Sequence, residues 1–235
     1  MTAVLRAICF DLDDTLWPVR PVLQRAEGRM LEYLRTTHPV LAASFNVEDF
    51  MAQRLALARE HPDRAHNMTW LRTTALRAWV SSHGHDPAIG DAAFAVFSAA
   101  RNDVNLFPDV VPALQRLASR YLLATFSNGN ADIKQIDIPV TFKVIMNAES
   151  VGIAKPHAQS FKAVAHALEL DPAQILYVGD DPHIDIAGAR SAGCVTAWIN
   201  RIGSLWPVSA GVVADFEISD LMSLADVLDQ HDDFT

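Results

Sequence analysis

The sequence predicts an α/β protein whose parallel sheet is interrupted, after its first strand, by an all-helical insert. Three observations favour this architecture. A continuous apolar run ends at Phe10, which is typical of a strand buried on both faces. From about residue 22 to residue 100 the apolar residues recur at helical spacing. Beyond residue 106 strands and helices alternate, which is the pattern of a parallel sheet covered on both sides.

The insert sets the predicted domain boundaries. Residues 17–21 contain two prolines, which we expect to break any helix and to form a linker after the first strand. About four helices and no strand are expected in the insert that follows. The predicted domains are therefore a helical-bundle cap over residues 17–105 and an α/β core made of residues 1–16 and 106–235.

The second part of the core carries the remaining strands. A helix is expected from Val110 to Arg120, with Pro112 in its first turn, where proline is tolerated. Because strands connected in this way run parallel, their carboxyl ends share the edge of the sheet where ligands bind. The strands expected here are residues 121–126, 142–146, 175–179, 195–199 and 212–218.

Composition excludes several classes of protein. The formal net charge of −9, with no basic stripe to offset it, argues against a nucleic acid as the main partner. No apolar run is long enough for a membrane span or a signal peptide, so no membrane partner is expected. The two cysteines, Cys9 and Cys194, resemble small buried apolar residues rather than a disulfide pair. We expect a cytoplasmic protein, either a monomer or a homodimer.

Three carboxylates follow the first strand. Asp11, Asp13 and Asp14 lie within four positions, and carboxylates crowded in this way repel one another unless a cation or a shared proton compensates. Asp14 alone is typical of a turn or a helix cap. Asp11 and Asp13 together are instead candidates for chemistry, because later segments supply groups that such a pair requires.

Those segments stand at later strand ends and helix starts. Taken one at a time, Ser127-Asn128-Gly129 is typical of a turn, Lys155 of a solvated surface lysine and Asp185 of a helix N-cap. Lys155 is, however, one of only four lysines in the chain. Together the segments place hydroxyl, ammonium and carboxylate groups at the same predicted edge of the sheet.

In their order and spacing, these segments resemble the four motifs of the haloacid dehalogenase superfamily. The resemblance covers the whole core, about residues 5–16 and 105–225, and one subgroup of the family inserts a helical bundle just after the first motif. It implies a Rossmann-like core with a helical cap. The matching segments are Asp11-Leu12-Asp13-Asp14-Thr15, Ser127, Lys155-Pro156, and Gly179-Asp180-Asp181 with Asp185.

The resemblance implies a Mg²⁺ cofactor and a covalent aspartyl-phosphate on Asp11. A carboxylate is ionised at neutral pH and needs no base to act as a nucleophile. Asp11 and Asp180 would bind the ion through their side chains, and Asp13 through its backbone carbonyl. Asp181 and Asp185 would lie just outside the ligands. The choice between Asp180 and Asp181 as the direct ligand stays open, although the spacing to Asp185 favours Asp180.

The resemblance also implies how the substrate is handled. Asp13 would be the general acid and base, since a residue two positions along an extended chain returns to the same face. Ser127 and Lys155 would bind the phosphoryl oxygens, and the backbone amide of Asn128 would add a donor. Trp17, which adjoins the first motif, is expected to line the cleft.

The predicted function is hydrolysis of a small phosphomonoester, such as a sugar phosphate, a nucleotide monophosphate or phosphoglycolate. Asp13 disfavours a haloacid dehalogenase, since a leaving halide needs no proton. The family's phosphonate-cleaving members use a cap lysine, and no lysine lies between Leu16 and Phe107. A sugar phosphomutase remains an alternative. A non-catalytic phospho-receiver is less favoured, because receivers are single domains of about 120 residues without a helical insert.

Overall fold

The structure is a computed structural model, which describes residues 4–231. The chain divides into two compact units, each with its own apolar core. The α/β unit contains Met1–Pro18, Asn105–Gly129 and Asp137–Thr235. The helical unit contains Val19–Val104 and the short segment Asn130–Ile136.

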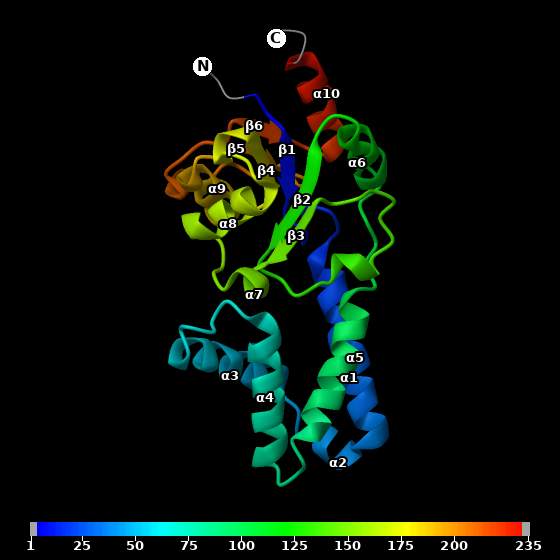
Figure 1. Cartoon of the computed structure of the whole chain (residues 1–235). Helices are drawn as coiled ribbons and strands as arrows, with labels where there is room; N and C mark the ends of the chain where they lie inside the picture. Colours follow the sequence, from blue (N-terminus) through cyan, green and yellow to red (C-terminus); the bar gives the residue numbers. More distant parts are fainter. Residues whose placement is uncertain (1–3, 232–235) are drawn as a thin grey trace. The chain divides into compact units, whose positions relative to one another are not determined.

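The α/β unit is built on one six-stranded parallel sheet, so the predicted α/β fold is confirmed. The strand order is β3-β2-β1-β4-β5-β6 (Figure 1). The chain therefore leaves the centre of the sheet in both directions, with β2 on one side of β1 and β4 on the other, which is where open α/β sheets form a crevice. The strands are β1 (Ala7–Phe10), β2 (Leu122–Ser127), β3 (Val144–Asn147), β4 (Ile175–Gly179), β5 (Val195–Ile199) and β6 (Phe216–Ile218).

Helices cover both faces of this sheet (Figure 1). On one face, α8 and α9 pack on inward side chains such as Cys9, Phe126 and Tyr177. On the other face, α6 and α10 pack against each other. The unit's helices are α6 (Val110–Ala118), α7 (Ala148–Val151), α8 (Ala158–Leu168), α9 (Ala187–Ala192), α10 (Leu221–His231), the 3₁₀ turns η2 (Pro172–Gln174) and η4 (Val208–Ala210), and the π-helical turn η3 (Pro182–Ile186).

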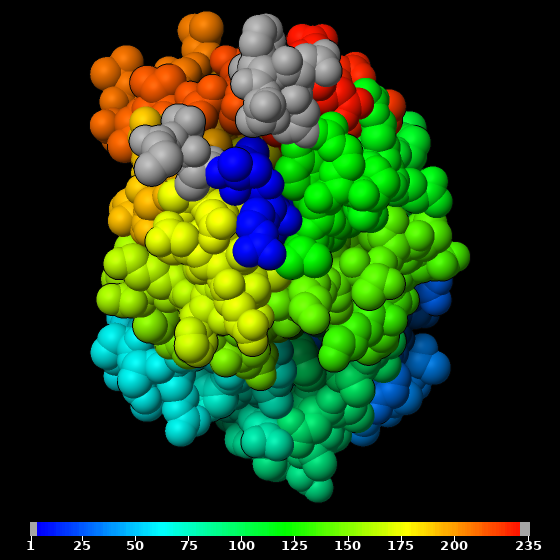
Figure 2. Space-filling model, turned by 45° about the horizontal axis from the view of Figure 1, so that its top comes forward, coloured from blue at the N-terminus to red at the C-terminus, as the bar shows by residue number. Residues whose placement is uncertain are grey.

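The amino-terminal edge of the sheet is closed by backbone hydrogen bonds. The N–H of Arg6 donates to the carbonyl of Gln174 at 2.9 Å, and the N–H of Leu122 donates to the carbonyl of Arg6 at 3.0 Å. Figure 2 shows this start of the chain in blue, between the green segment of α6 and β2 and the yellow segment of α8. The chemical groups singled out in the sequence all follow the opposite, carboxyl ends of the strands.

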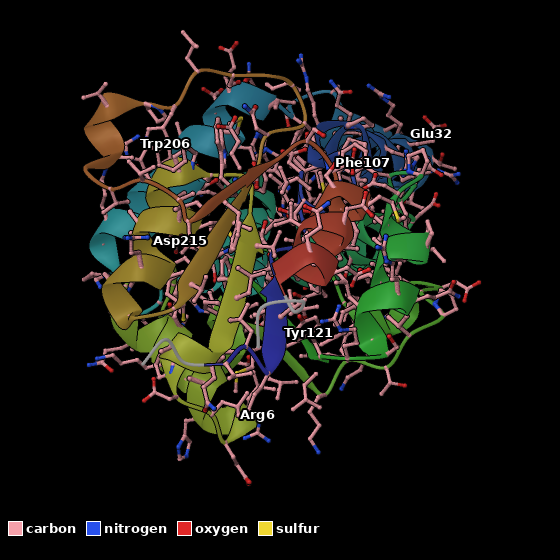
Figure 3. All side chains as sticks on the ribbon, turned by 90° about the horizontal axis from the view of Figure 1, so that it is seen from above. Arg6, Glu32, Phe107, Tyr121, Trp206 and Asp215 are labelled. Atoms are coloured by element: carbon pink, nitrogen blue, oxygen red, sulfur yellow. The ribbon has the colours of Figure 1, made fainter. Side chains whose placement is uncertain are left out.

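The last strand is shorter than predicted, because β6 begins at Phe216 rather than near residue 212. The carboxylate of Asp215 (labelled in Figure 3) accepts hydrogen bonds from the backbone N–H and the hydroxyl of Thr196, each at 2.9 Å. It also binds Arg190 at 2.7 Å. A side chain thus takes a contact that a backbone carbonyl would make in a longer strand, and the pairing of β5 with β6 starts at Ala197 and Phe216.

The helical unit shows that the predicted linker was wrong. The helix α1 (Val19–Thr37) begins directly after Pro18 and contains Pro21 in its first turn. Proline is tolerated there because the N–H groups of the first turn have no partner within the helix. Apolar residues of α1, α3, α4 and α5 form the core of this unit, among them Met30, Phe50 and Phe97.

The other elements of the helical unit begin at asparagine caps or short turns. Asn46 accepts hydrogen bonds from the backbone at the start of α3, and Asn67 does so for α4. The short segment that follows β2 joins this unit through Asn102, whose side chain bonds Asp132 and Gln135. The elements are α2 (Pro39–Ala42), α3 (Val47–Glu60), α4 (Met68–Ser82), α5 (Ala88–Arg101) and the 3₁₀ turn η1 (Ile133–Gln135). Among residues 4–231, no helix combines the length and the apolar character needed to cross a bilayer.

Candidate active site

The predicted site residues gather at the carboxyl edge of the sheet. Asp11 follows β1, Ser127 ends β2 and Asp180 follows β4, and these three strands are neighbours in the sheet. Together they border a cavity of about 190 Å³, which has room for several waters or for a phosphoryl group and an ion. Its lining includes eight of the nine predicted residues, namely Asp11, Asp13, Ser127, Asn128, Lys155, Asp180, Asp181 and Asp185.

Lys155 is a buried ammonium rather than a surface lysine. Its side chain is only 2% exposed, and Nζ lies 2.6 Å from Oδ1 of Asp11 and 2.7 Å from Oδ1 of Asp185. Its third hydrogen bond, of 2.9 Å, goes to the hydroxyl of Tyr177. The loop that carries Lys155 is held by Asn128, whose side chain accepts from the Lys155 N–H at 2.8 Å and donates to its carbonyl at 3.1 Å.

The electrostatics of the cavity indicate a shortage of positive charge. Burial raises the pKa of Asp11 to about 7, even though Lys155 opposes this shift, and Asp185 adds to it. Burial and the neighbouring carboxylates of Asp185 and Asp11 raise the pKa of Asp180 to about 8. Burial disfavours the Lys155 ammonium, but Asp11 and Asp185 outweigh it and raise the pKa of Lys155. One lysine therefore does not balance the carboxylates, and a divalent cation would stabilise their ionised forms.

Three acidic side chains lie close enough together to hold a metal ion. One carboxylate oxygen from each of Asp11, Asp180 and Asp185 lies within 4.8 Å of the others. Hard cations such as Mg²⁺ prefer oxygen ligands of this kind, so these residues fit the predicted cofactor. Asp185 was expected outside the ligands, yet its carboxylate belongs to this group as well as binding Lys155.

The structure also separates Asp180 from Asp181. Oδ1 of Asp181 accepts the backbone N–H groups of His183 at 2.8 Å and Ile184 at 2.9 Å, so this carboxylate caps η3. Asp180, and not Asp181, belongs to the acidic group with Asp11. The geometry thus favours Asp180 between the two alternatives that the sequence left open.

Trp17 does not lie where the sequence suggested. Its side chain has no exposed surface and does not line the cavity, so the expected substrate contact is not what the structure shows. The indole N–H instead donates to Oδ1 of Asp13 at 2.9 Å, and the Asp14 N–H donates to the Trp17 carbonyl at 2.7 Å. Trp17 therefore closes the turn after β1 and orients the Asp13 carboxyl group.

Two contributors to the site carry no signal in the sequence. Tyr177 lies within the apolar run of β4 and therefore resembles an ordinary core residue, although its hydroxyl binds Lys155. Trp198 donates its indole N–H to the backbone carbonyl of Asp180 at 2.8 Å from the neighbouring strand β5. Only the three-dimensional register of the strands brings these side chains to the site.

Gly179 provides a direct test of how tightly the site is packed. A Cβ atom at this position would overlap the carboxyl group of Asp185. We therefore expect Gly179→Ala to displace Asp185 and lower kcat at least about 100-fold, because catalytic groups tolerate little misplacement. Kinetics with any phosphate ester that the wild type hydrolyses would measure this.

A matched glycine offers the control. Gly28 lies inside α1, and a Cβ atom there meets nothing within 4 Å. Gly28→Ala should leave kcat unchanged and raise the free energy of unfolding by about 0.5–1 kcal/mol, since Ala favours a helix interior over Gly. Wild-type kcat in Gly179→Ala would show that the position of Asp185 does not matter.

Comparison with known proteins relates the chain to one family of hydrolases. A family model described as haloacid dehalogenase-like hydrolase matches residues 5–193. The chain is 30% identical over 230 residues to the 5-amino-6-(5-phospho-D-ribitylamino)uracil phosphatase YigB of Escherichia coli (strain K12), covering 95% of the chain and 96% of that protein. It is 28% identical over 243 residues to a glyceraldehyde 3-phosphate phosphatase of Methanopyrus kandleri, covering 96% and 97%.

Among solved structures, one similar protein is described as a 2-haloacid dehalogenase from Pseudomonas syringae pv. Tomato DC3000. The TM-score is 0.90 at 33% sequence identity, and the match covers 97% of the chain and 99% of that protein. The two kinds of relative differ in the reaction that their names state. The match to YigB and the match to this solved structure each extend over the α/β unit and the helical unit.

Proposed function

Because the chain belongs to the haloacid dehalogenase-like hydrolase family, we propose that it is a Mg²⁺-dependent phosphatase of small phosphomonoesters. The observation that carries this proposal is the cavity that Asp11, Asp180 and Asp185 line together, with a single buried lysine bound to Asp11 and Asp185. An anionic phosphoryl group could enter such a site only with additional positive charge. Mg²⁺, when bound, would supply that charge and reduce repulsion between the carboxylates and the phosphoryl oxygens.

Asp11 and Asp13 divide the chemistry between them. A carboxylate oxygen of Asp11 forms a bond to phosphorus while the ester P–O bond breaks, and Asp13 gives its proton to the leaving oxygen. Asp13 then takes a proton from water, whose oxygen attacks phosphorus and releases phosphate and the free Asp11 carboxylate. The indole of Trp17 holds Asp13 in one orientation through both steps.

Three further groups that line the cavity receive the phosphoryl oxygens. Ser127 accepts the Gly129 N–H at 3.0 Å, which leaves its own hydroxyl proton to donate to substrate. The Lys155 ammonium and the backbone amide of Asn128 add two more donors. These donors act where negative charge spreads in the transition state. Asp185 keeps Lys155 in place.

The names of the relatives narrow the substrate class. YigB is named for a phosphoribityl compound that contains a uracil ring, and the Methanopyrus relative for a three-carbon sugar phosphate. Another Escherichia coli relative, 25% identical over 230 residues, is named a pyrimidine 5'-nucleotidase. We propose a small phosphorylated metabolite of the sugar phosphate or nucleotide kind as the substrate.

A haloacid dehalogenase is the alternative that the 33% identical structure favours. Asp13 argues against it, because a halide leaves without a proton whereas an alkoxide requires one. The deciding experiment incubates the protein and Mg²⁺ with a panel of sugar phosphates, nucleotide monophosphates and phosphoglycolate, and separately with 2-chloropropionate. Phosphate release supports the proposal; chloride release without phosphate release would replace it with the dehalogenase. A phosphomutase would instead transfer the phosphoryl group between positions of a sugar.

The raised pKa values predict how magnesium binding depends on pH. In the metal-free protein, Asp11 and Asp180 titrate near pKa values of about 7 and about 8. Protons compete with the ion for the same oxygens, so Mg²⁺ affinity should fall steadily from about pH 9 to about pH 6, with release of protons on binding. Calorimetry in buffers of different ionisation enthalpy measures both quantities. Asp180→Asn should flatten this dependence, and an affinity independent of pH in the wild type would contradict the assignment.

A further inference from the structure

Tyr177 joins two of the groups that receive the phosphoryl oxygens. Its hydroxyl lies 2.9 Å from Nζ of Lys155 and 2.9 Å from the backbone carbonyl of Phe126, the residue before Ser127. Lysine has only donors and a carbonyl has only acceptors. The phenol therefore accepts from Lys155 and gives its single proton to the carbonyl of Phe126, which is nearer than the other acceptor in reach, Oδ1 of Asp185 at 3.4 Å.

These bonds complete the coordination of Lys155. In the cavity without substrate, the three protons of the ammonium go to Asp11 at 2.6 Å, Asp185 at 2.7 Å and Tyr177 at 2.9 Å, so a bound phosphoryl oxygen would take the proton now donated to Asp11. The two carboxylates belong to the acidic group, so the strength of their bonds to Lys155 depends on the charge in the cavity. Tyr177 is the neutral member of the three, and its place does not depend on the charge state of the cavity.

The ring of Tyr177 is itself fixed. It is only 1% exposed and lies within β4, in the core cluster between the sheet and α8. Phe161 packs against it edge to face, with ring centroids 4.9 Å apart. Neither the strand nor the packed ring can shift without disturbing the core, so the hydroxyl is a rigid reference point.

We propose that Tyr177 is a positioning residue, whose hydroxyl holds the Lys155 ammonium at a fixed distance from the Ser127 end of β2 so that both meet the same phosphoryl group. This inference rests on the proposed phosphatase function, because it assigns Ser127 and Lys155 to the phosphoryl oxygens. Tyr177 does not line the cavity and acts through Lys155.

The first test compares Tyr177→Phe with Tyr121→Phe. Tyr121 is a buried tyrosine of the same unit (labelled in Figure 3), and its hydroxyl makes no hydrogen bond within the part of the chain that the structure describes. Tyr177→Phe keeps the ring and its packing. We expect it to lower kcat about 10- to 100-fold with KM changed by less than about threefold, the loss typical of removing a partner that orients a catalytic group. Tyr121→Phe should match the wild type.

The second test does not depend on turnover. Three of the four lysines are exposed, so in protein labelled with ¹⁵N-lysine only Lys155 should give an ammonium signal protected from exchange. We expect this signal in the wild type and in Tyr121→Phe, and its loss or marked broadening in Tyr177→Phe. Absence of the signal in the wild type would overturn the proposal whether or not the variant folds.

The third test separates an action through Lys155 from a general structural effect. Orthovanadate affinity is measured for the wild type, Tyr177→Phe, Lys155→Met and the double variant. If Tyr177 acts through Lys155, Tyr177→Phe weakens binding in the wild type and has no further effect in Lys155→Met. An equal loss in both backgrounds, or wild-type kcat in Tyr177→Phe, would overturn the proposal. A wild type that hydrolyses no ester would refute the phosphatase function instead, while the lysine signal would still test the contact.

Discussion

Asp11→Asn is expected to abolish hydrolysis of phosphate esters, with kcat lowered at least about 1000-fold, because the amide cannot form the bond to phosphorus. The loss should not come from unfolding. Burial raises the pKa of Asp11 to about 7, so about half of this carboxyl group is already neutral in the metal-free protein near neutral pH, and in the variant Lys155 keeps its bonds to Asp185 and Tyr177. Phosphate release and a thermal melt in the absence of metal measure the two effects.

Asp14→Asn is the matched control for this prediction. Asp14 lines the same cavity three positions along the chain, and its φ of 57° is a conformation that Asn adopts readily. The variant should retain kcat within about threefold of the wild type, because no bond-making step is assigned to Asp14. Equal loss in the two variants would mean that the cavity needs negative charge in general rather than a nucleophile at Asp11.

Removal of divalent ions is expected to lower kcat as much as Asp11→Asn does. EDTA should abolish turnover and Mg²⁺ should restore it, since three carboxylates and one lysine leave the cavity too negative for a phosphorylated substrate. Mg²⁺ should also raise the melting temperature of the wild type, because a ligand that binds only the folded state stabilises it. The melting temperature provides a readout independent of activity.

Substitutions of the adjacent residues Asp180 and Asp181 test which of the two carboxylates binds Mg²⁺. Asp180→Asn should lose most of the activation and most of the thermal shift by Mg²⁺, because its carboxylate belongs to the acidic group. Asp181→Asn should keep both, since its carboxylate caps η3 and Asn is an equally good cap. Retained Mg²⁺ activation in Asp180→Asn, with loss in Asp181→Asn, would reverse the assignment.

Much of the fold and of the candidate site can be predicted from the sequence, because the chemical groups follow the ends of strands. The apolar run before Asp11 predicts a buried parallel strand, and β4 before Asp180 repeats the pattern. Parallel strands then bring their carboxyl ends to one edge without any further information. The structure confirms the predicted fold, and the comparisons confirm the family and the hydrolase class.

What the sequence could not provide is the direction of individual side chains. Asp180 and Asp181 are adjacent and chemically identical, and only the turn into η3 sends one to the acidic group and the other to a helix cap. Trp17 follows the first motif closely, yet it turns into the interior to bind Asp13. Tyr177 gives no polar signal within an apolar strand, because its hydroxyl matters only once Lys155 is folded against it.

The prediction of a linker over residues 17–21 was wrong for a different reason. Two prolines near each other usually end a helix, but a helix that begins just before Pro21 places it in the first turn, where it costs nothing. The pattern alone does not say on which side of the prolines the helix lies.

A cytoplasmic location and an assembly as a monomer or homodimer stay predictions.

The most direct test is the mass of the peptide that contains Asp11, isolated after an acid quench during turnover. Asp13→Asn enzyme and p-nitrophenyl phosphate are the best pair, because this leaving group departs without a proton whereas breakdown of the intermediate still needs a base. We predict one phosphoryl group on that peptide, absent when Asp11→Asn is added. An Asp11 peptide that stays unmodified while p-nitrophenol is released in a burst, or a phosphoryl group on another peptide, would contradict the account.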